Sequence, residues 1–378
     1  MTMTERDPKR ASPIVLVAGG TGGHVFPAEA LAGELSGLGH ALALLTDSRG
    51  AAWSKSIAGI TTYAVRAGRV SGVGLARRAK GVLDLILGTL QSRRLLRRLT
   101  PSVVVGFGGY TSVPALMAAS SLRLPTLIHE QNAFLGRANR LLAPRVTAIA
   151  TSFPKVEKIT GAMARKAVLT GNPVRPAVRA LRDIPYQAPA AGGEIHLLVT
   201  GGSQGARILS EVIPASLAAL DEDLRARIRL AQQCRPEDID AVSAAYAEMG
   251  LAAEVAPFFE DLAARLGRAH LVICRSGAST VAELTVAGRP AILVPYAHAA
   301  DDHQSFNARA VVVAGGAKMM AESEFTPAAL AAALTELLTQ PETLAAMARG
   351  AHGAGHADAA GALARLATSL IDGGRDPS

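Results

Sequence analysis

Glycine-rich turns follow two apolar stretches of the chain, and each turn comes before a segment of helical character. The first lies within residues 15–24 (VLVAGGTGGH) and the second within residues 197–206 (LLVTGGSQGA). Glycine lets the backbone N–H groups of such a turn approach an anion closely, and the dipole of the following helix attracts negative charge. Neither spacing matches the dinucleotide fingerprint or a Walker loop. The two turns therefore predict two sites for phosphate or another anion.

Four further clusters of glycine or polar residues follow predicted strands. Their sequences are GFGGYTSVP at 106–114, HEQN at 129–132, CRSGAST at 274–280 and DDHQ at 301–304. Any one of them is better explained as a helix cap or a turn, because Ser, Thr, Asp and Gly favour those positions. Ligands of parallel α/β sheets, however, bind at the carboxyl ends of the strands. With the two glycine turns, the set favours a shared binding cleft.

These clusters need a scaffold that brings strand ends together, and the chain alternates apolar strands with helices in both halves. Strands in the first half are predicted at 14–18, 41–45, 103–107, 126–128 and 146–150. Strands in the second half are predicted at 195–200, 230–233, 254–256, 271–273 and 291–294. Helices are predicted from Pro27 onward, at 210–220, 238–249, 279–287 and 304–314, and from Thr326 to about Ile371 with a glycine break at 350–355. This alternation indicates parallel sheets with helices on both faces.

Length and composition favour two ordinary globular domains. With 378 residues, 49% of them hydrophobic and 19% charged, the chain is too long for one core and too apolar for broad disorder. A Pro/Ala/Gly-rich stretch from Thr170 to Gly193 is predicted to link the domains. Cys234 and Cys274 stand in unrelated contexts, so we expect two reduced thiols and no structural zinc. No apolar run reaches the length of a membrane span and residues 1–12 lack a signal-peptide core, which favours a cytoplasmic protein.

A basic and apolar segment lies between Leu75 and Leu99. It holds seven basic residues and one acidic residue, a net charge of +6 out of +8 for the whole chain. Leucines and Ile86 recur in it at helical spacing. Such a helix can bind anionic lipid headgroups and acyl chains, but it can equally be a core helix with a solvated basic face. Composition alone leaves both interpretations open.

Seven motifs in the same order carry a resemblance that covers nearly the whole chain. They are GGTGGHVFPA, GFGGYTSVPA, HEQNAFLGRANR, TGNPVR, GGSQGA, CRSGASTVAEL and DDHQSFNA. With these motifs the chain resembles the MurG family, peripheral membrane glycosyltransferases of peptidoglycan synthesis. The resemblance implies an α/β protein of the GT-B fold, in which two Rossmann-like doubly wound domains face a central cleft. The domains would be an N-terminal acceptor and membrane-associating domain at 12–173 and a C-terminal UDP-sugar-binding domain at 174–352, with a C-terminal helix at 353–372 packed back on the first.

The activity implied is an inverting transfer of N-acetylglucosamine from UDP-N-acetylglucosamine to the muramoyl 4-hydroxyl of lipid I, the undecaprenyl-diphosphate-linked N-acetylmuramoyl-pentapeptide. The product would be lipid II, made at the cytoplasmic face of the bacterial inner membrane. The expected partners are UDP-N-acetylglucosamine, lipid I, the anionic membrane surface and other proteins of cell-wall synthesis and division, but no nucleic acid. No cofactor is expected. No obligatory metal is expected either, because no D-x-D motif follows a predicted strand.

Two other classes of protein remain as alternatives. A UDP-sugar epimerase of the GT-B fold would use the same nucleotide domain without a lipid acceptor. The basic, apolar segment at 75–99 argues against it, because an epimerase has no evident use for a membrane face. A non-catalytic nucleotide-binding or scaffold protein is the other alternative, and polar groups expected from both domains at the cleft argue against that one.

The resemblance also assigns roles to residues at matching positions. Those implied to bind the donor are Thr21, Gly22, Gly23, Asn132, Arg175, Ser203, Phe259, Arg275, Ala278, Ser279, Thr280, Glu283 and Gln304. Ser203 and the backbone at 277–280 would receive the diphosphate, and Arg175 and Arg275 would add charge-assisted contacts. Such contacts and helix dipoles would stabilise the leaving UDP.

The nucleoside and the sugar would be recognised by other residues of this set. Glu283 would accept hydrogen bonds from the ribose hydroxyls, because a carboxylate offers two acceptor oxygens. Gln304, which is both donor and acceptor, would read the sugar hydroxyls with help from Asn132 of the first domain. Phe259 would form part of the wall around uracil.

The acceptor and the catalytic base are expected on the N-terminal domain. The acceptor diphosphate would lie near residues 21–23 and against Gly108, Gly109 and Tyr110. Inversion needs a base that takes the proton of the acceptor hydroxyl. His24 is the leading candidate, because it ends the first glycine turn and its pKa lies near working pH. Glu130 is the alternative base, and in that case His24 would only bind phosphate.

Overall fold

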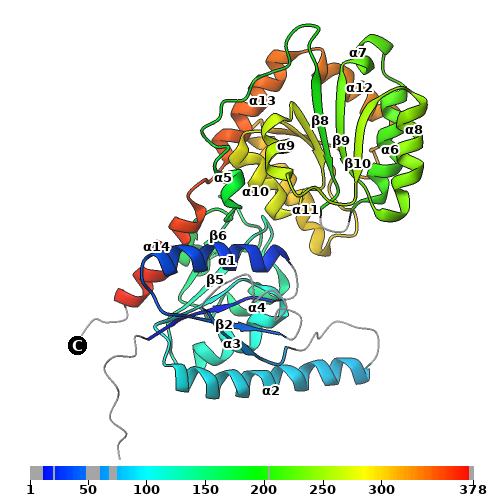
Figure 1. Ribbon diagram of the computed structural model, residues 1–378. Coiled ribbons are helices and arrows are strands. Elements are labelled where there is room, and N and C mark those ends of the chain that lie inside the picture. Colours follow the sequence, from blue (N-terminus) through cyan, green and yellow to red (C-terminus); the bar gives the residue numbers. More distant parts are fainter. Residues whose placement is uncertain (1–11, 20–21, 48–59, 68–74, 203–204, 374–378) are drawn as a thin grey trace, which may run out of the picture. The chain divides into compact units, whose positions relative to one another are not determined.

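The computed structural model describes residues 12–19, 22–47, 60–67, 75–202 and 205–373, and the structural statements below concern these residues. The chain forms two compact units (Figure 1). Unit 1 comprises residues 1–131, 135–173 and 358–378, and unit 2 comprises residues 132–134 and 174–357.

Unit 1 contains a parallel sheet with seven strands in the described residues. In chain order they are β1 (Ile14–Val17), β2 (Leu42–Thr46), β3 (Thr61–Ala64), β4 (Val103–Gly106), β5 (Thr126–Glu130), β6 (Ala148–Thr151) and β7 (Ala167–Leu169). Their order across the sheet is β3-β2-β1-β4-β5-β6-β7. The strand order reverses between β1 and β4, where Val17 pairs with Gly106. Gly19, with which the first glycine turn begins, and the turn after β4 therefore lie at the switch point of the sheet, the usual ligand position in this architecture.

Helices cover both faces of this sheet (Figure 1). They are α1 (Gly22–Gly37), α2 (Leu75–Leu99), α3 (Gly109–Ser121), α4 (Arg137–Leu142) and α14 (Ala359–Asp372), with a 3-10 turn at Ala164–Lys166. The C-terminal helix α14 packs along α1. Its Leu363 and Ala367 belong to the same buried cluster as Leu16 and Leu31. On the other side of the sheet, α2 packs along α3.

Unit 2 repeats the plan with a six-stranded parallel sheet in the described residues. Its strands are β8 (Ile195–Thr200), β9 (Ile228–Gln233), β10 (Ala252–Ala256), β11 (Leu271–Cys274), β12 (Ala291–Leu293) and β13 (Ala317–Met319). The order across the sheet is β10-β9-β8-β11-β12-β13. Because the strands are parallel, the loops after β8, β11, β12 and β13 all leave from one edge of the sheet.

The helices of unit 2 again lie on both sides of the sheet (Figure 1). They are α5 (Pro176–Arg179), α6 (Arg207–Ala218), α7 (Glu222–Ala226), α8 (Ile239–Glu248), α9 (Leu262–Arg268), α10 (Ala278–Ala287), α11 (His303–Val313), α12 (Pro327–Leu338) and α13 (Pro341–Ala354), with 3-10 turns at Pro236–Asp238 and Ala300–Asp302. Apolar side chains of α6, α8 and α12 form one buried cluster with the inner strands, including Ile213, Tyr246 and Leu334.

The ten predicted strands are all present, each within two residues at either end. Three short strands, β3, β7 and β13, were not predicted. Helix α1 begins at Gly22 and has Pro27 inside it, so the predicted start at Pro27 was five residues late. The predicted linker contains the short helix α5.

The glycine break predicted at 350–355 was wrong for most of its length, because α13 continues to Ala354. A Cβ atom on Gly350 would lie 2.4 Å from the carbonyl oxygen of Ala314. Glycine therefore stands inside this helix so that another segment can approach its backbone closely. The break between α13 and α14 falls at residues 355–358 instead.

Both cysteines are buried free thiols. Burial raises the pKa of the Cys274 thiol to about 12. The pKa of Cys234 is also raised, mainly by burial, and its sulfur lies 3.2 Å from the hydroxyl of Ser210. No helix among the described residues is long and apolar enough to cross a membrane.

Candidate active site

His24 lies at the first turn of α1 against the loop that follows β4. A Cβ atom on Gly108 would lie 3.4 Å from Cε1 of the imidazole, and one on Gly109 would lie 3.4 Å from Cδ2. Both glycines have positive φ angles, 84° and 69°, which other residues rarely adopt. Tyr110, in the first turn of α3, is half-buried. The structure thus brings together His24 and the three residues predicted to contact the acceptor diphosphate.

The imidazole of His24 is held in its neutral form. Burial lowers its pKa below the usual 6.5, and hydrogen bonding with the Phe107 backbone and the Gln131 side chain only partly opposes this effect. Its Nδ1 atom is buried and has no hydrogen-bond partner among the described residues. A neutral imidazole whose nitrogen has no hydrogen-bond partner can accept a proton. Gly22 and Gly23 precede it in α1, whereas Thr21 lies outside the described residues.

Glu130, the alternative base, is buried at the end of β5. Its Oε2 atom accepts hydrogen bonds from the Gly136 backbone N–H (2.9 Å) and from Nδ2 of Asn139 (2.8 Å). Gly136 is the residue that precedes α4, and Asn139 lies within that helix. This carboxylate therefore fixes the start of α4, and its Oε2 atom is occupied in doing so.

His129 and Gln131, beside Glu130, connect the end of β5 to the segments that follow β7 and β4. The Nε2 atom of His129 lies 3.1 Å from the carbonyl oxygen of Gly171, and Gln131 donates from Nε2 to the carbonyl of Phe107 at 2.8 Å. Burial lowers the pKa of His129 to about 4, so this imidazole is neutral near pH 7. These bonds give the HEQN cluster a structural role that its sequence did not indicate.

In unit 2, the ribose candidate Glu283 is paired with Arg175. The guanidinium donates from Nε to Oε1 at 2.7 Å and from Nη2 to Oε2 at 2.8 Å. The pKa of Arg175 is raised, chiefly by this hydrogen bonding. Two residues predicted to bind the donor thus lie in contact, and the predicted partner of Arg175, the diphosphate, would have to share the guanidinium with Glu283.

The start of α10 has the features of an anion site. Gly277 precedes the helix with a β-type backbone, and no side chain of the described residues caps the first turn. Ala278, Ser279 and Thr280 are half-buried there. Their N–H groups point out of the helix end without helical partners, and the helix dipole adds positive potential. Glu283 lies on the second turn of the same helix.

The second glycine turn lies next to α6 in the same unit. A Cβ atom on Gly201 would lie 2.4 Å from the backbone nitrogen of Ala206, so these two residues approach each other closely. Gly202 and Gly205 have positive φ angles, 79° and 68°. Ser203, the predicted diphosphate contact, lies outside the described residues.

Asn307 joins three segments near the start of α11. Its Nδ2 atom donates to Oδ1 of Asn132 at 3.1 Å and to the carbonyl of Ser276 at 3.0 Å, and its Oδ1 accepts from the N–H of Ala133 at 2.8 Å. Residues 132–134 group with unit 2, although they follow a strand of unit 1 and were predicted to belong to the first domain. Asn132 therefore lies with the other predicted donor residues. The sequence placed Asn307 after the DDHQ cluster but gave it no role.

Arg275 follows β11, and Gln304 is the second residue of α11. Gln304 accepts at Oε1 from the backbone N–H of Tyr296 at 3.0 Å. Arg275 is buried and donates from Nη2 to Oε1 of Glu322 at 2.7 Å. Its observed partners are thus a carboxylate and nearby carbonyl groups, and Glu322 is a residue that the sequence did not single out.

Phe259 is buried, and the guanidinium carbon of Arg265 lies 4.0 Å from the centre of its ring. The preceding Phe258 is 65% exposed. Its ring, rather than that of Phe259, is the aromatic surface that this loop offers to solvent, a distinction that the sequence FF did not reveal.

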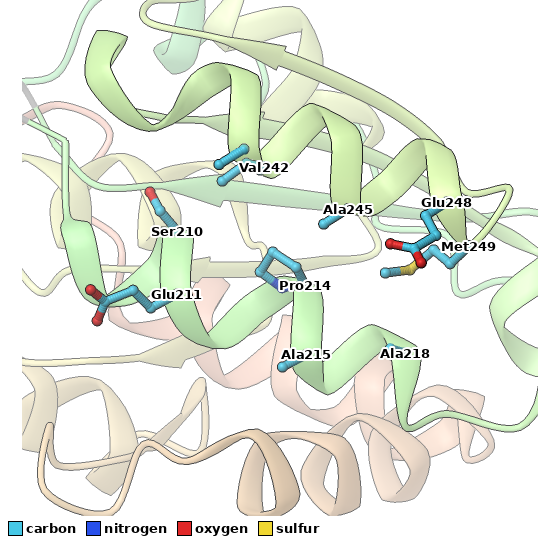
Figure 2. Close-up of a pocket in the computed structure, with 10 residues that line it drawn as sticks. Ser210, Glu211, Pro214, Ala215, Ala218, Val242, Ala245, Glu248 and Met249 are labelled. Atoms are coloured by element: carbon cyan, nitrogen blue, oxygen red, sulfur yellow. The ribbon is translucent and has the colours of Figure 1, made fainter.

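A hollow of about 530 Å³ lies on unit 2 between α6 and α8 (Figure 2). Its floor is formed by small and apolar residues such as Pro214, Ala215 and Val242, and Glu211 and Glu248 lie near its two ends (Figure 2). None of the predicted site residues lines it. Within the described residues, no cluster of three or more His, Cys, Asp or Glu side chains could hold a metal ion.

Comparison with known proteins agrees with the geometry of both units. Residues 14–151 match the glycosyltransferase family 28 N-terminal domain, and residues 196–363 match the glycosyltransferase family 28 C-terminal domain. The UDP-N-acetylglucosamine–N-acetylmuramyl-(pentapeptide) pyrophosphoryl-undecaprenol N-acetylglucosamine transferase of Rhodospirillum centenum is 57% identical over 353 residues, 93% of each chain. The crystal structure of MurG from Acinetobacter baumannii matches with a TM-score of 0.78 at 30% identity and covers 94% of this chain and 99% of that one.

The fold is shared more widely than the sequence. The UDP-GlcNAc 2-epimerase of Neisseria meningitidis matches with a TM-score of 0.65, covering 96% of this chain and 100% of that one, but at 12% identity. At that identity the likeness shows the fold alone. The prediction of two Rossmann-like units of the GT-B fold is confirmed, and the epimerase alternative has less support than the transferase.

Proposed function

Because this chain belongs to the MurG family of glycosyltransferases, we propose that it moves N-acetylglucosamine from UDP-N-acetylglucosamine to the muramoyl 4-hydroxyl of lipid I. The hydroxyl oxygen attacks C1 of the sugar as the bond to the diphosphate breaks. The products are lipid II, with inversion at C1, and UDP. The proton of the hydroxyl passes to a base on the enzyme.

One observation on unit 2 supports donor binding most directly: the uncapped first turn of α10 is followed one turn later by Glu283. The N–H groups of residues 278–280 would bind the diphosphate, and the Glu283 carboxylate, oriented by Arg175, would accept from the ribose hydroxyls. Negative charge that builds up on the departing UDP would be stabilised at the same helix end. Ser203 and Gln304 keep their predicted roles at the diphosphate and the sugar.

His24 on unit 1 is the base that we propose. Burial lowers the pKa of its imidazole, so the ring is neutral near pH 7, and its Nδ1 atom has no hydrogen-bond partner beside the glycine turn after β4. The N–H groups and positive φ angles of Gly108 and Gly109 suit close approach of the acceptor diphosphate. Glu130 is a weaker candidate, because it is buried and bonded to Gly136 and Asn139.

Helix α2 would attach the protein to an anionic membrane surface. The buried side of α2 contains small residues, among them Gly88 and Ser92. Its apolar residues Val82, Leu83, Ile86, Leu87 and Leu90 are 37–54% exposed. Residues 83, 86, 87 and 90 share one helical face, and the exposed Arg94, Arg97 and Arg98 continue that face. Of the two interpretations that composition left open, this arrangement favours the membrane helix.

We therefore place the protein at the cytoplasmic face of the inner membrane as a peripheral protein, where lipid I presents its muramoyl group. Anionic lipid, lipid I and UDP-N-acetylglucosamine are the proposed partners. Proteins of cell-wall synthesis and division would act with it there.

The test is an assay of purified protein with labelled UDP-N-acetylglucosamine and a lipid I analogue. Transfer of label to the analogue with a β linkage, and release of one UDP for each transfer, is the expected result. An epimerase would instead convert the nucleotide sugar without any acceptor. Acceptor-independent loss of UDP-N-acetylglucosamine, with no labelled lipid, would overturn the proposal.

A further inference from the structure

Arg275 spans the ends of three neighbouring strands in unit 2. It follows β11, and its Nη1 atom donates to the carbonyl oxygens of Val294 (3.2 Å) and Pro295 (3.3 Å), which follow β12. Its Nη2 atom donates to Oε1 of Glu322, which follows β13, at 2.7 Å. One guanidinium thus ties together the carboxyl ends of β11, β12 and β13.

The ion pair of Arg275 and Glu322 is largely shielded from solvent. The side chain of Arg275 is 10% exposed and that of Glu322 is 19% exposed. Burial alone would raise the pKa of Glu322, but hydrogen bonds from Arg275 and from the Ala297 N–H outweigh it and hold the pKa below its usual value. Removing one member of such a pair leaves the other charge poorly compensated.

Glu322 and Gln304 together hold the loop between β12 and α11. Oε2 of Glu322 accepts from the backbone N–H of Ala297 at 2.8 Å, and Oε1 of Gln304 accepts from the N–H of Tyr296 at 3.0 Å. The ring of Tyr296 lies 5.3 Å from the guanidinium carbon of Arg275. The Ser276 hydroxyl donates to the carbonyl of Gln304 at 2.9 Å. Adjacent backbone N–H groups of the loop are therefore bound by Glu322 and by Gln304.

The same loop holds an unusual backbone. Asp301 and Asp302 are consecutive non-glycine residues with φ angles of 55° and 54°. Left-handed conformations of this kind persist only where the surroundings enforce them. They come directly before α11, so they set the direction in which that helix begins, and Gln304 is its second residue.

The bond to Tyr296 also decides how Gln304 can act. Its amide oxygen accepts from the Tyr296 N–H, which fixes the orientation of the amide group. Held in this way, Gln304 turns its N–H₂ group away from Tyr296, where it can donate to an outside partner. A sugar hydroxyl or the carbonyl of an N-acetyl group can accept from it.

We propose that Arg275 is a positioning residue: with Glu322 it holds the loop 295–302 so that Gln304 presents its amide N–H to the sugar of the donor. The inference deepens the proposed function and rests on it. It differs from the diphosphate contact that the sequence suggested for Arg275, because the guanidinium here acts through Glu322 and the loop without touching the donor.

The two roles predict different losses for two ligands, UDP and UDP-N-acetylglucosamine. Calorimetry would measure the Kd of each for the wild type, for Arg275→Met and for Glu322→Gln. A positioning role predicts that both variants weaken UDP-N-acetylglucosamine about tenfold, the equivalent of one sugar hydrogen bond, and change UDP by less than about twofold. The double variant should lose no more than either single variant, because both act on one loop.

A diphosphate contact predicts the reverse pattern. Arg275→Met would then weaken UDP and UDP-N-acetylglucosamine equally, and Glu322→Gln would leave both nearly unchanged. Either result would overturn the positioning role. Glu322→Gln keeps the shape of the side chain, so it carries the test if Arg275→Met does not fold. Arg275→Lys keeps the positive charge but lacks the planar guanidinium with its several N–H donors. It should therefore recover only part of the affinity for UDP-N-acetylglucosamine that Arg275→Met loses.

Glu336→Gln is the matched control. It removes the carboxylate that pairs with Lys318 on β13 at 2.7 Å, an exposed ion pair of the same unit that does not contact the loop. It should bind both ligands as the wild type does. If the wild-type protein binds neither UDP nor UDP-N-acetylglucosamine, the proposed function itself fails. If the wild type binds both but the variants lose both ligands equally, only the positioning role fails.

Discussion

Arg175 and Glu283 lie 108 residues apart in the sequence, yet their side chains form a bidentate ion pair with N···O distances of 2.7 and 2.8 Å. Arg175 precedes α5, and Glu283 lies in α10. A bidentate ion pair fixes the plane of the carboxylate as well as its position. Each oxygen keeps a further lone pair, so the carboxylate can still accept from a vicinal diol. In the donor site that we propose, this geometry would let Glu283 accept from the hydroxyls of the ribose.

We expect Glu283→Ala to weaken donor binding while the fold is kept. Loss of a charged acceptor for ribose hydroxyls costs about 1.5–3 kcal/mol, so the KM for UDP-N-acetylglucosamine should rise at least about tenfold. Steady-state kinetics on a soluble acceptor would measure it. Glu248→Ala, an exposed glutamate at the end of α8, serves as the matched control. An unchanged donor KM in Glu283→Ala would remove this residue from the site.

His24→Ala should lower kcat far more than it raises the donor KM. Loss of a general base removes about 10²–10⁴-fold, whereas loss of a phosphate contact acts mainly on binding. A retained kcat with poor acceptor binding would instead indicate that His24 binds phosphate, and Glu130 would become the first candidate for the base.

The pH profile gives an independent test of His24. Burial lowers its pKa below 6.5, so the neutral, proton-accepting form persists to lower pH than in a free histidine. Activity is lost only when the pH falls through this lowered pKa, so the acid limb of kcat/KM should lie below pH 6.5. An acid limb above 6.5 would contradict a buried neutral imidazole as the base.

Charge reversal at Arg94, Arg97 and Arg98 should release the protein from anionic vesicles. Each basic residue near such a surface contributes roughly 1 kcal/mol, and salt weakens that attraction but not the burial of leucine. Arg93 is left unchanged, because it donates to the hydroxyl of Ser121 on α3. Co-sedimentation with liposomes would measure the release. Turnover of a short-chain soluble acceptor should be unaffected, and undiminished vesicle binding would mean that these arginines are only a solvated face.

Gly88→Ala should destabilise unit 1. A Cβ atom at this position would lie 2.1 Å from the carbonyl oxygen of Arg66 and 3.3 Å from Cβ of Pro114, so α2 would have to move. Overpacking of this kind typically costs about 1–3 kcal/mol. Gly33→Ala in α1 is the control, because nothing lies within 4 Å of its added Cβ, and it should be neutral or slightly stabilising. Urea unfolding would measure the free energy of unfolding of both variants. Equal values for Gly88→Ala and Gly33→Ala would contradict the close contact of α2.

The buried strands were predictable from the sequence, because a strand that is covered on both faces consists of an unbroken run of apolar residues. The residues of β1 and β4 are buried throughout, and both strands were predicted. By contrast, β3 and β7 lie at the two edges of their sheet and are largely exposed, so burial placed no apolar pattern on them. Gly350 was misread for a related reason: its neighbour Ala314 is distant in sequence, and only the fold shows their close approach.

The positions of the candidate residues after strands were predictable from the sequence, but their contacts were not. Residue type suggested roles for Glu283 and Gln304, and the helices that carry them, α10 and α11, follow the neighbouring parallel strands β11 and β12 of unit 2. No local pattern, however, indicates that Arg275 pairs with Glu322, 47 residues later, or that Asn307 bonds to Asn132, 175 residues earlier. The first pair depends on which strands of the sheet are neighbours, and the second on residues 132–134 grouping with unit 2, and both are properties of the folded chain.

The two buried thiols make this protein convenient for chemical labelling. The chain has only Cys234 and Cys274, and burial raises the pKa of both, to about 12 for Cys274, so little reactive thiolate is available near neutral pH. A new cysteine at Leu83 or Leu90 on the exposed side of α2 would therefore react with maleimide dyes far faster than the native pair. An environment-sensitive fluorophore at that position would report insertion into lipid in real time, in a chain that keeps both natural cysteines.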